Sequence, residues 1–249
     1  MDVLPIEVLN IILNLIKDDQ ASLLALNRTN SYLNRLCTPL LYRSPSFSNL
    51  QRLEAFILHA RPDAALHVKS LDFLNISHRW DREFSSLFEL LLTKTNNVEE
   101  IMLDYSTISP NSFTHIESLP HVRYLSFVGT KGVRDQLVYD VSFKCPSIRA
   151  IDLSKTPITD NSLKAIALNC QQMESVDLAG CEKITEAGVR CLTEHLSNLR
   201  YLNVANCYNV VASQEELDRG GNLDIVWSDG EDEYETETTE TDDDGHGSD

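Results

Sequence analysis

The segment AIDLSKTPITDNSLKAIALNC, from Ala150 to Cys170, contains the pattern that decides the fold. Its first residues alternate apolar and polar side chains, as a short β-strand with one buried side does. From Ile158 onward the apolar residues recur at helical spacing, up to a closing cysteine. The segment therefore predicts a strand, a turn and a helix in succession.

The strand part of this pattern recurs along the chain. Six stretches share an apolar residue followed three and five positions later by two more: VKSLDF from Val68, VEEIML from Val98, VRYLSF from Val122, IRAIDL from Ile148, MESVDL from Met173 and LRYLNV from Leu199. A second register agrees with the first, because Ile108, Val133, Ile158 and Ile184 each lie twelve residues before Pro120, Cys145, Cys170 and Leu196. Repeats of this length predict stacked units, each with a strand, a turn and a helical segment. Such stacks more often bind partners than catalyse reactions.

These repeats resemble the cysteine-containing leucine-rich repeats. The closest matches are AIDLSKTPITDNSLKAIALNC and SVDLAGCEKITEAGVRCL, with Cys145-Pro146 closing the unit before them. The resemblance runs from about Val68 to Val210 and implies an α/β solenoid of about six repeats, with a curved parallel sheet and helices on its convex side. Leu223 and Val226 are expected to form a degenerate closing strand. The first unit carries an insert, and we predict a longer helix within Ile76–Leu92, around Trp80, Phe84, Leu87 and Leu91.

The amino-terminal stretch from Leu4 to Tyr42 predicts three short helices. A proline stands at the start of the first, two aspartates precede the second, and Pro39 is expected to end the third. The thirteen residues from Leu4 to Ile16 include nine Leu, Ile or Val and a single charged residue, Glu7. That is more apolar surface than one small core can bury, so either the repeat stack or a partner must cover it.

Leu4-Pro5, the apolar helix after it and the terminal PLLYRS resemble an F-box of the fungal F-box/leucine-rich-repeat type. The resemblance implies that the helices dock on a Skp-family adaptor, which links them to a cullin in an SCF-type ubiquitin ligase, while the repeats hold the substrate. The adaptor-binding residues it implies are Leu4, Pro5, Ile6, Val8, Leu9, Ile12, Leu23 and Leu26. The alternative is that these helices only cap the repeat stack at its amino-terminal end.

Residues 44–66 are expected to join the two parts rigidly, since they contain no Gly/Ser linker. A strand-like SPSF is followed by a helix whose apolar positions are Leu50, Leu53, Ile57 and Leu58. The domain organisation is then an F-box over 1–43, a linking helix and cap over 44–66, repeats over 67–227 and a disordered acidic tail over 228–249.

The strand residues between the inward apolar ones should face outward on the concave side. The expected middle column is Asp72, Met102, Ser126, Asp152, Asp177 and Asn203, and the flanking positions include Asp104, Tyr124 and Tyr201. From these we predict a substrate surface of Asp72, Met102, Asp104, Tyr124, Asp152, Asp177, Tyr201 and Asn203. Its acidic character with apolar and aromatic anchors favours a protein partner that is basic at the contact. Aspartates between leucines are also ordinary solvated residues in such repeats.

Other functions find little support in the sequence. The longest uncharged apolar run, Val8–Ile16, is short of the ~20 residues of a membrane helix, and Asp2 and Glu7 do not suit a signal peptide. The cysteines follow the repeat period, which predicts packing in the core and not metal ligation or disulfides. No catalytic or phosphate-binding motif occurs, and no basic patch suits nucleic acid. We therefore expect a non-catalytic, cofactor-free protein of the cytoplasm or nucleus.

The last residues are strongly acidic. Between Asp229 and Asp249 there are eleven Asp or Glu and no Lys or Arg, in a chain whose net charge is −17. Such a segment is expected to be disordered and is usually a solvating appendage. It also raises a rival function: an acidic-tailed repeat protein, similar to the acidic leucine-rich nuclear phosphoproteins, that chaperones basic proteins such as histones. A repeat scaffold without a ligase role is a third possibility.

Overall fold

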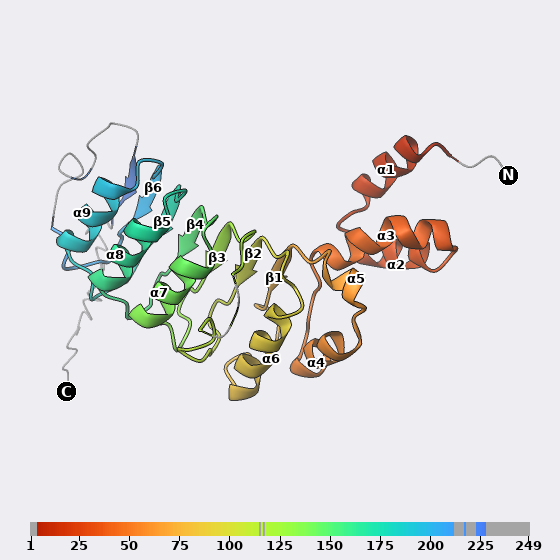
Figure 1. The fold of residues 1–249 in the computed structure, drawn as a ribbon, viewed down its shortest axis with the longest axis horizontal. Helices are drawn as coiled ribbons and strands as arrows, with labels where there is room; N and C mark the ends of the chain where they lie inside the picture. The colour runs from red at the N-terminus through yellow and green to blue at the C-terminus, as the bar shows by residue number, and fades with distance from the viewer. Residues whose placement is uncertain (1–3, 115, 117, 212–216, 218–222, 228–249) are drawn as a thin grey trace, which may run out of the picture.

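The structure is a computed structural model that describes residues 4–114, 116, 118–211, 217 and 223–227. A group of helices at the amino-terminal end is followed by a stack of strands and helices, and the two parts follow one another along the length of the molecule (Figure 1). The predicted acidic tail, from residue 228 onward, lies outside the described residues.

The stack contains a sheet of parallel three-residue strands that pair in chain order. The strands are β1 (Ser70–Asp72), β2 (Glu100–Met102), β3 (Tyr124–Ser126), β4 (Ala150–Asp152), β5 (Ser175–Asp177), β6 (Tyr201–Asn203) and β7 (Asp224–Val226). Their central residues stand in one row across the sheet, from Leu71 to Ile225, and all are buried. The predicted solenoid is thus confirmed. The closing strand exists, but its buried residue is Ile225, because the pairing register turns Val226 outward.

Helices cover one face of the sheet and leave the other open (Figure 1). They are α6 (Arg82–Leu92), α7 (Asp135–Lys144), α8 (Asp160–Asn169) and α9 (Glu186–His195). The insert helix is confirmed, with Phe84 and Leu91 buried, but Trp80 lies before its first turn and is exposed. We call the uncovered side of the sheet the open face.

The second repeat departs from the predicted pattern, because residues 110–114 form turns and not a helix. Pro110 and Pro120 bound this short unit, and its Asn, Ser and Thr residues have low helix propensity. Phe113 fills the space that a helix would occupy, with its ring centroid 5.9 Å from Phe88 and 6.1 Å from Phe127. Packing of one aromatic side chain thus replaces helix packing in the core.

The amino-terminal helices are α1 (Ile6–Leu15), α2 (Gln20–Asn27) and α3 (Ser31–Arg43). Asp19 caps α2 through its side chain, and Asn30 caps α3 by accepting a hydrogen bond from the Leu33 amide at 2.9 Å. The prediction that Pro39 ends the third helix is wrong, since α3 continues to Arg43. Packing explains the difference: Leu40 and Leu41 contact the same small core as Cys37, and this outweighs one lost backbone hydrogen bond.

The connection between the two parts is a capping segment. The helix α4 (Leu50–His59) buries Leu53 and Ile57 in the repeat core, whereas Leu58 is exposed. A short helix, α5 (Pro62–Ala65), then leads into β1. The strand expected at SPSF is absent, because Phe47 instead turns inward, with its ring centroid 5.3 Å from that of Phe56. None of the helices in the described ranges is long and apolar enough to span a membrane.

Neighbouring repeats are tied together by carboxylates at the first turns of their helices. Asp135 at the start of α7 accepts hydrogen bonds from the Thr159 amide at 2.8 Å, the Thr159 hydroxyl at 2.7 Å and the buried Ser162 hydroxyl at 2.7 Å. Asp160 repeats the arrangement with the amide and hydroxyl of Thr185. Burial alone would raise the pKa of Asp135, but the hydrogen bonds from Ser162 and Thr159 outweigh it and lower the pKa below its ordinary value of 3.8.

We expect Asp135→Ala to lower the free energy of unfolding by about 2–3 kcal/mol, because it leaves the Thr159 and Ser162 donors without their acceptor. Asp135→Asn keeps one carbonyl acceptor and should lose less. A lowered folded-state pKa stabilises the protein above pH 3.8, and that contribution is lost as the pH falls through the lowered value. Urea unfolding of wild type and Asp135→Asn should therefore give a stability difference that shrinks below pH 3.8. A difference independent of pH would contradict the role of the charge.

Candidate functional site: two binding surfaces

The helix α1 has two apolar sides, and only one of them is used inside the protein. Leu13 is buried, and Leu9 and Ile16 are partly buried, on the side that faces α2 and α3. Ile11 is 62% exposed and Leu15 is 81% exposed on the opposite side. Leu4, Val8 and Ile12 are exposed as well, at positions that share this side because they recur every three or four residues.

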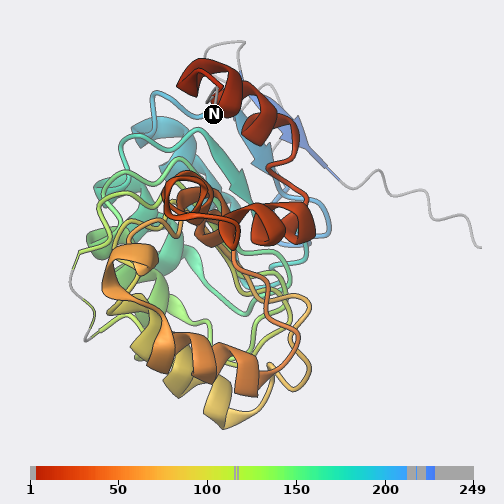
Figure 2. The same cartoon turned by 90° about the vertical axis from the view of Figure 1, so that its right-hand side faces the viewer.

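The amino-terminal helices have a core of their own. It contains Leu13, Leu23 and Cys37, with Ile16, Leu26, Leu36, Leu40 and Leu41 packed around them, and it is separate from the core of the repeats. Figure 1 and the end-on view in Figure 2 both show α1 lying apart from the helices that cover the sheet. The repeat stack therefore leaves the outer side of α1 uncovered.

This geometry divides the predicted adaptor-binding residues into two groups. Leu4, Pro5, Ile6, Val8 and Ile12 are exposed, whereas Leu9 and Leu26 are partly buried. Leu23 is wholly buried, so its side chain supports the helices and offers no surface to a partner in this conformation. The sequence prediction also left out Ile11 and Leu15, the two most exposed apolar residues of α1. The signal that identifies them is helical spacing, because Ile11 lies three residues after Val8 and Leu15 lies four residues after Ile11.

The open face carries the second candidate surface. The pairing register places Asp72, Met102, Ser126, Asp152, Asp177 and Asn203 in one row across neighbouring strands, as predicted. The row beside it contains Glu100, Tyr124 and Tyr201, also in register. The residues predicted for substrate binding are partly exposed, and Ser126 between them is buried. Asp104 follows β2 and completes the set.

The carboxylates of the open face have structural partners. Asp72, Asp152 and Asp177 each accept a hydrogen bond from the amide two residues later, at 2.8, 2.9 and 3.0 Å. Asp177 also accepts from the Ser154 hydroxyl at 2.6 Å and the Asn203 amide group at 2.9 Å. These bonds stabilise the turn after each strand, which agrees with the ordinary role of aspartate in such repeats. Each carboxylate still keeps part of its surface in solvent.

Asp104 is arranged differently and connects two repeats. Its Oδ1 accepts from the Ser126 hydroxyl at 2.5 Å and from the Val128 amide at 3.2 Å, both on the neighbouring unit. Burial raises the pKa of Asp152, and the charges of Asp177 and Asp104 raise it further. The pKa of Tyr124 and of Tyr201 is raised by the same two effects, burial first. The open face is therefore a region of negative potential, which favours cationic partners.

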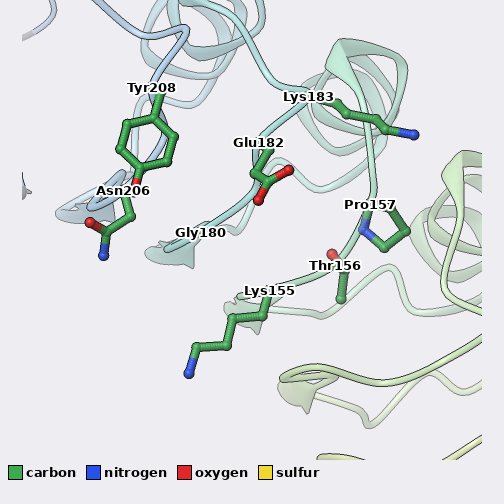
Figure 3. A pocket seen from close by; sticks show the side chains of 8 residues that line it. All are labelled: Lys155, Thr156, Pro157, Gly180, Glu182, Lys183, Asn206 and Tyr208. Atoms are coloured by element: carbon green, nitrogen blue, oxygen red, sulfur yellow. The ribbon is translucent and has the colours of Figure 1, made fainter.

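A pocket of about 550 Å³ lies at the edge of the open face, where the loops leave β4, β5 and β6. Figure 3 shows its lining residues: Lys155, Thr156, Pro157, Gly180, Glu182, Lys183, Asn206 and Tyr208. Lys155 and Lys183 bracket Glu182, so the pocket presents charges of both signs beside an exposed tyrosine ring. The sequence prediction missed this pocket because its members come from three separate loops.

The cysteines lie where the repeat period predicted. Cys145 and Cys170 end α7 and α8, and Cys181 and Cys207 follow β5 and β6, where each thiol is 3.1 Å from a carbonyl oxygen of the preceding repeat. Burial raises the pKa of Cys145 and of Cys170 to about 12, which keeps both as unreactive thiols. Among the described residues, no cluster of His, Cys, Asp or Glu has the arrangement of a metal site.

Comparison with protein families accounts for both parts of the chain. The COS11 F-box domain family matches residues 1–79, and a leucine-rich-repeat family matches residues 144–167. The amino-terminal helices thus match an F-box model, and part of the stack matches a leucine-rich-repeat model. The F-box match extends over α4, α5 and β1, and the repeat match covers β4 and most of α8. Both families are non-catalytic binding modules, in agreement with the sequence prediction.

Curated proteins similar to this chain include F-box/LRR-repeat protein 5 of Xenopus tropicalis, which is 34% identical over 71 residues, or 28% of this chain and 10% of that protein. The protein of the same name from Salmo salar is 29% identical over 80 residues, or 31% of this chain and 12% of that protein. The matched stretches thus span about a tenth of the length of these relatives.

Two solved structures are distantly similar to this chain. A chain in the crystal structure of the Rad7 and Elc1 complex in yeast is 16% identical, with a TM-score of 0.46 over 66% of this chain and 44% of that chain. An internalin C2 from Listeria monocytogenes is 14% identical, with a TM-score of 0.43 over 71% of this chain and 91% of that chain. Neither likeness is close enough to bear on function.

Proposed function

We propose that this protein is the substrate-recognition subunit of an SCF-type cullin-based ubiquitin ligase. The observation that carries the proposal is the uncovered apolar side of α1, on a helical module whose core is separate from that of the repeats. An exposed apolar patch of this kind marks a protein interface. An F-box at this position implies that a Skp-family adaptor covers the patch and connects the chain to a cullin in the cytoplasm or nucleus.

The repeats would supply the substrate surface. The open face combines carboxylates with half-buried Met102, Tyr124 and Tyr201, which suits a protein segment that carries Lys or Arg beside apolar residues. Lysines in the same basic segment of the substrate would then be held near the conjugating enzyme that carries the activated ubiquitin. The protein itself would contribute binding and orientation, and the chemistry would belong to the other subunits.

The joint between the two modules supports such positioning. The Lys69 amide donates to the Arg43 carbonyl at 2.8 Å, so the end of α3 is hydrogen-bonded directly to the residue before β1. Lys69 also forms an ion pair with Glu99 at 2.8 Å, which lies ahead of β2. A substrate on the open face would therefore keep a defined orientation relative to an adaptor on α1.

Calorimetry with a purified Skp-family adaptor from a related species tests the proposal. The wild-type chain should bind, and a Leu4→Ala/Pro5→Ala variant should bind more weakly while its thermal unfolding stays unchanged. The alternative is that the helices only cap the stack. In that case the folded wild type would not bind the adaptor, and the variant would lose stability.

The negative potential of the open face also favours a second candidate function, the chaperoning of basic proteins with help from the acidic tail. That function requires the tail to contribute to binding. Removal of residues 228–249 should then weaken binding of a purified histone dimer strongly, whereas a ligase subunit would keep its adaptor affinity after the same truncation. The chaperone function ranks second because it gives the uncovered side of α1 no role.

A further inference from the structure

A patch of large exposed side chains lies where the first two repeat strands enter their loops. Leu74 is 49% exposed, Trp80 is 53% exposed and Tyr105 is 49% exposed. The pairing of β1 with β2 ends at Asp72 and Met102, and Leu74 and Tyr105 follow in the loops that leave these two neighbouring strands. We call Leu74, Trp80 and Tyr105 the loop-edge patch. It borders the open face and is separate from α1 and from the pocket at the other end of the sheet.

Arg79 fixes the geometry of the loop-edge patch. Its Nε donates to the Asp104 carbonyl at 3.2 Å and its Nη1 donates to the Ile76 carbonyl at 3.3 Å. Its guanidinium carbon also lies 5.7 Å from the centre of the Trp80 ring. The loops after β1 and β2 are therefore linked, and the Trp80 ring has a fixed neighbour before any partner arrives. A pre-ordered surface of this kind loses little conformational entropy on binding.

Tyr105 occupies a backbone conformation that suits glycine. Its φ is 53°, and the same left-handed conformation recurs at the equivalent position of each following repeat, at Gly129 (58°), Lys155 (57°), Gly180 (70°) and Asn206 (58°). A β-carbon at Gly129 would lie 2.9 Å from Cδ1 and Cε1 of the Tyr105 ring, so the ring rests directly on that glycine. The left-handed conformation costs roughly 1–2 kcal/mol for a residue with a side chain. Tyr105 thus presents an exposed aromatic side chain where two other repeats have glycine.

The charges around the loop-edge patch indicate what it binds. Asp72 and Glu100 lie on the adjoining strands of the open face, and Asp104 lies in the turn after β2. The guanidinium of Arg79 is occupied by carbonyl oxygens, and His78 lies 3.6 Å from the carboxylate of Asp81. A partner that places an apolar side chain on the rings would therefore meet carboxylates on its flanks.

The geometry points to the loop-edge patch as the anchor for a peptide segment in which a bulky apolar side chain is flanked by Lys or Arg. The apolar side chain packs on Trp80 and Tyr105, and the flanking cations pair with the carboxylates of Asp72, Glu100 and Asp104. The identification of this segment as a substrate rests on the proposed ligase function, but the binding itself needs no adaptor.

Intrinsic fluorescence tests the patch directly, because the chain has only two tryptophans, Trp80 and Trp227. The indole nitrogen of Trp227 is buried without a hydrogen-bond partner among the described residues, so Trp227→Phe removes an unsatisfied donor and should preserve stability. In full-length Trp227→Phe protein the emission then reports on Trp80 alone. The probes are short synthetic peptide pools without Trp or Tyr, in which Leu, Phe or Met is flanked by Lys and Arg.

The basic pool should shift the Trp80 emission to shorter wavelength in a saturable way and protect it from acrylamide quenching. Tyr105→Gly should weaken this binding at least tenfold with the fold intact, because glycine suits the backbone conformation there. Leu74→Ala should weaken it in the same direction. The matched control is Tyr208→Ala, which removes a more exposed tyrosine at the other end of the sheet and should leave binding unchanged.

Two further peptide pools test which side chains the patch requires. One pool has Glu and Asp in place of the basic residues, and the other has Ser in place of the apolar residues. Equal binding of either pool, equal loss in Tyr208→Ala, or no binding by the folded protein would overturn the inference. Adaptor affinity measured by calorimetry on the same preparation separates the two proposals. Peptide binding without adaptor binding would count against the ligase function alone, and the reverse would count against the patch alone.

Discussion

A variant with Ile11→Glu and Leu15→Glu is expected to lose adaptor binding by more than a hundredfold while its folded state stays as stable as wild type. Both side chains are mostly in solvent in the free chain, at 62% and 81% exposure, so their replacement removes no internal packing. Burial in a complex would contribute about 1.5–3 kcal/mol for each, and a glutamate in the interface adds a desolvation cost. A loss of about 3 kcal/mol corresponds to roughly two orders of magnitude in affinity.

Calorimetry with the Skp-family adaptor and thermal unfolding of the free chain measure the two halves of this prediction. The control is Leu168→Glu on α8, because Leu168 is 67% exposed and lies in the repeats, away from α1. That variant should bind the adaptor as wild type does. Equal loss in the control would indicate a general effect of added charge. Unchanged affinity in the Ile11/Leu15 variant would show that the outer side of α1 is not the docking surface.

A second large effect is expected from Gly132→Ala, which should lower the free energy of unfolding by at least about 3 kcal/mol. The φ of Gly132 is 99°, and a β-carbon there would lie 1.9 Å from the carbonyl oxygen of Ile108. Neither the backbone conformation nor the contact can be relieved locally. The Ile108 amide also bonds the Lys131 carbonyl at 3.0 Å, so any shift would break the connection between the second and third repeats.

Gly180→Ala is the matched control for Gly132→Ala. Its φ of 70° imposes a left-handed conformation as well, but the nearest atom to the new β-carbon is Cγ of Lys155 at 3.4 Å, in a flexible side chain. Gly180→Ala should lower the free energy of unfolding by roughly 1–2 kcal/mol, from the left-handed backbone conformation alone. Denaturant unfolding followed by circular dichroism gives both values. Similar losses for the two variants would mean that the close contact at Gly132 relaxes easily.

The repeat architecture could be predicted because its signals are local and periodic. Apolar residues at the first, fourth and sixth positions of each stretch fix which side of a three-residue strand is buried, and the strands then pair in chain order. The row from Asp72 to Asn203 followed from the same alternation. The apolar content of Leu4–Ile16 likewise showed that α1 needs a cover.

Features that depend on packing between distant residues were missed or wrong. The helix α3 continues past Pro39 because Leu40 and Leu41 pack on a core shared with α2. A rule based on neighbouring residues in the sequence does not include this packing. The second repeat forms turns because Phe113 reaches Phe88 and Phe127 from units before and after it. Local rules gave the opposite answer in both places: the helix-breaking effect of proline predicted an end at Pro39, and the repeat period predicted a helix in the second unit.

The sequence by itself determined the solenoid, its strand register and the surplus of apolar residues in the first helix, because each follows from side-chain spacing along the chain. Only the tertiary structure decided which apolar residues stay in solvent: Leu13 faces a core, whereas Leu15 faces outward. The same holds for the loop-edge patch, where Arg79 lies over the Trp80 ring and donates to the carbonyl of Asp104, the residue before Tyr105 in the next repeat. Exposure depends on which elements come together in space, and spacing along one element does not specify its neighbours.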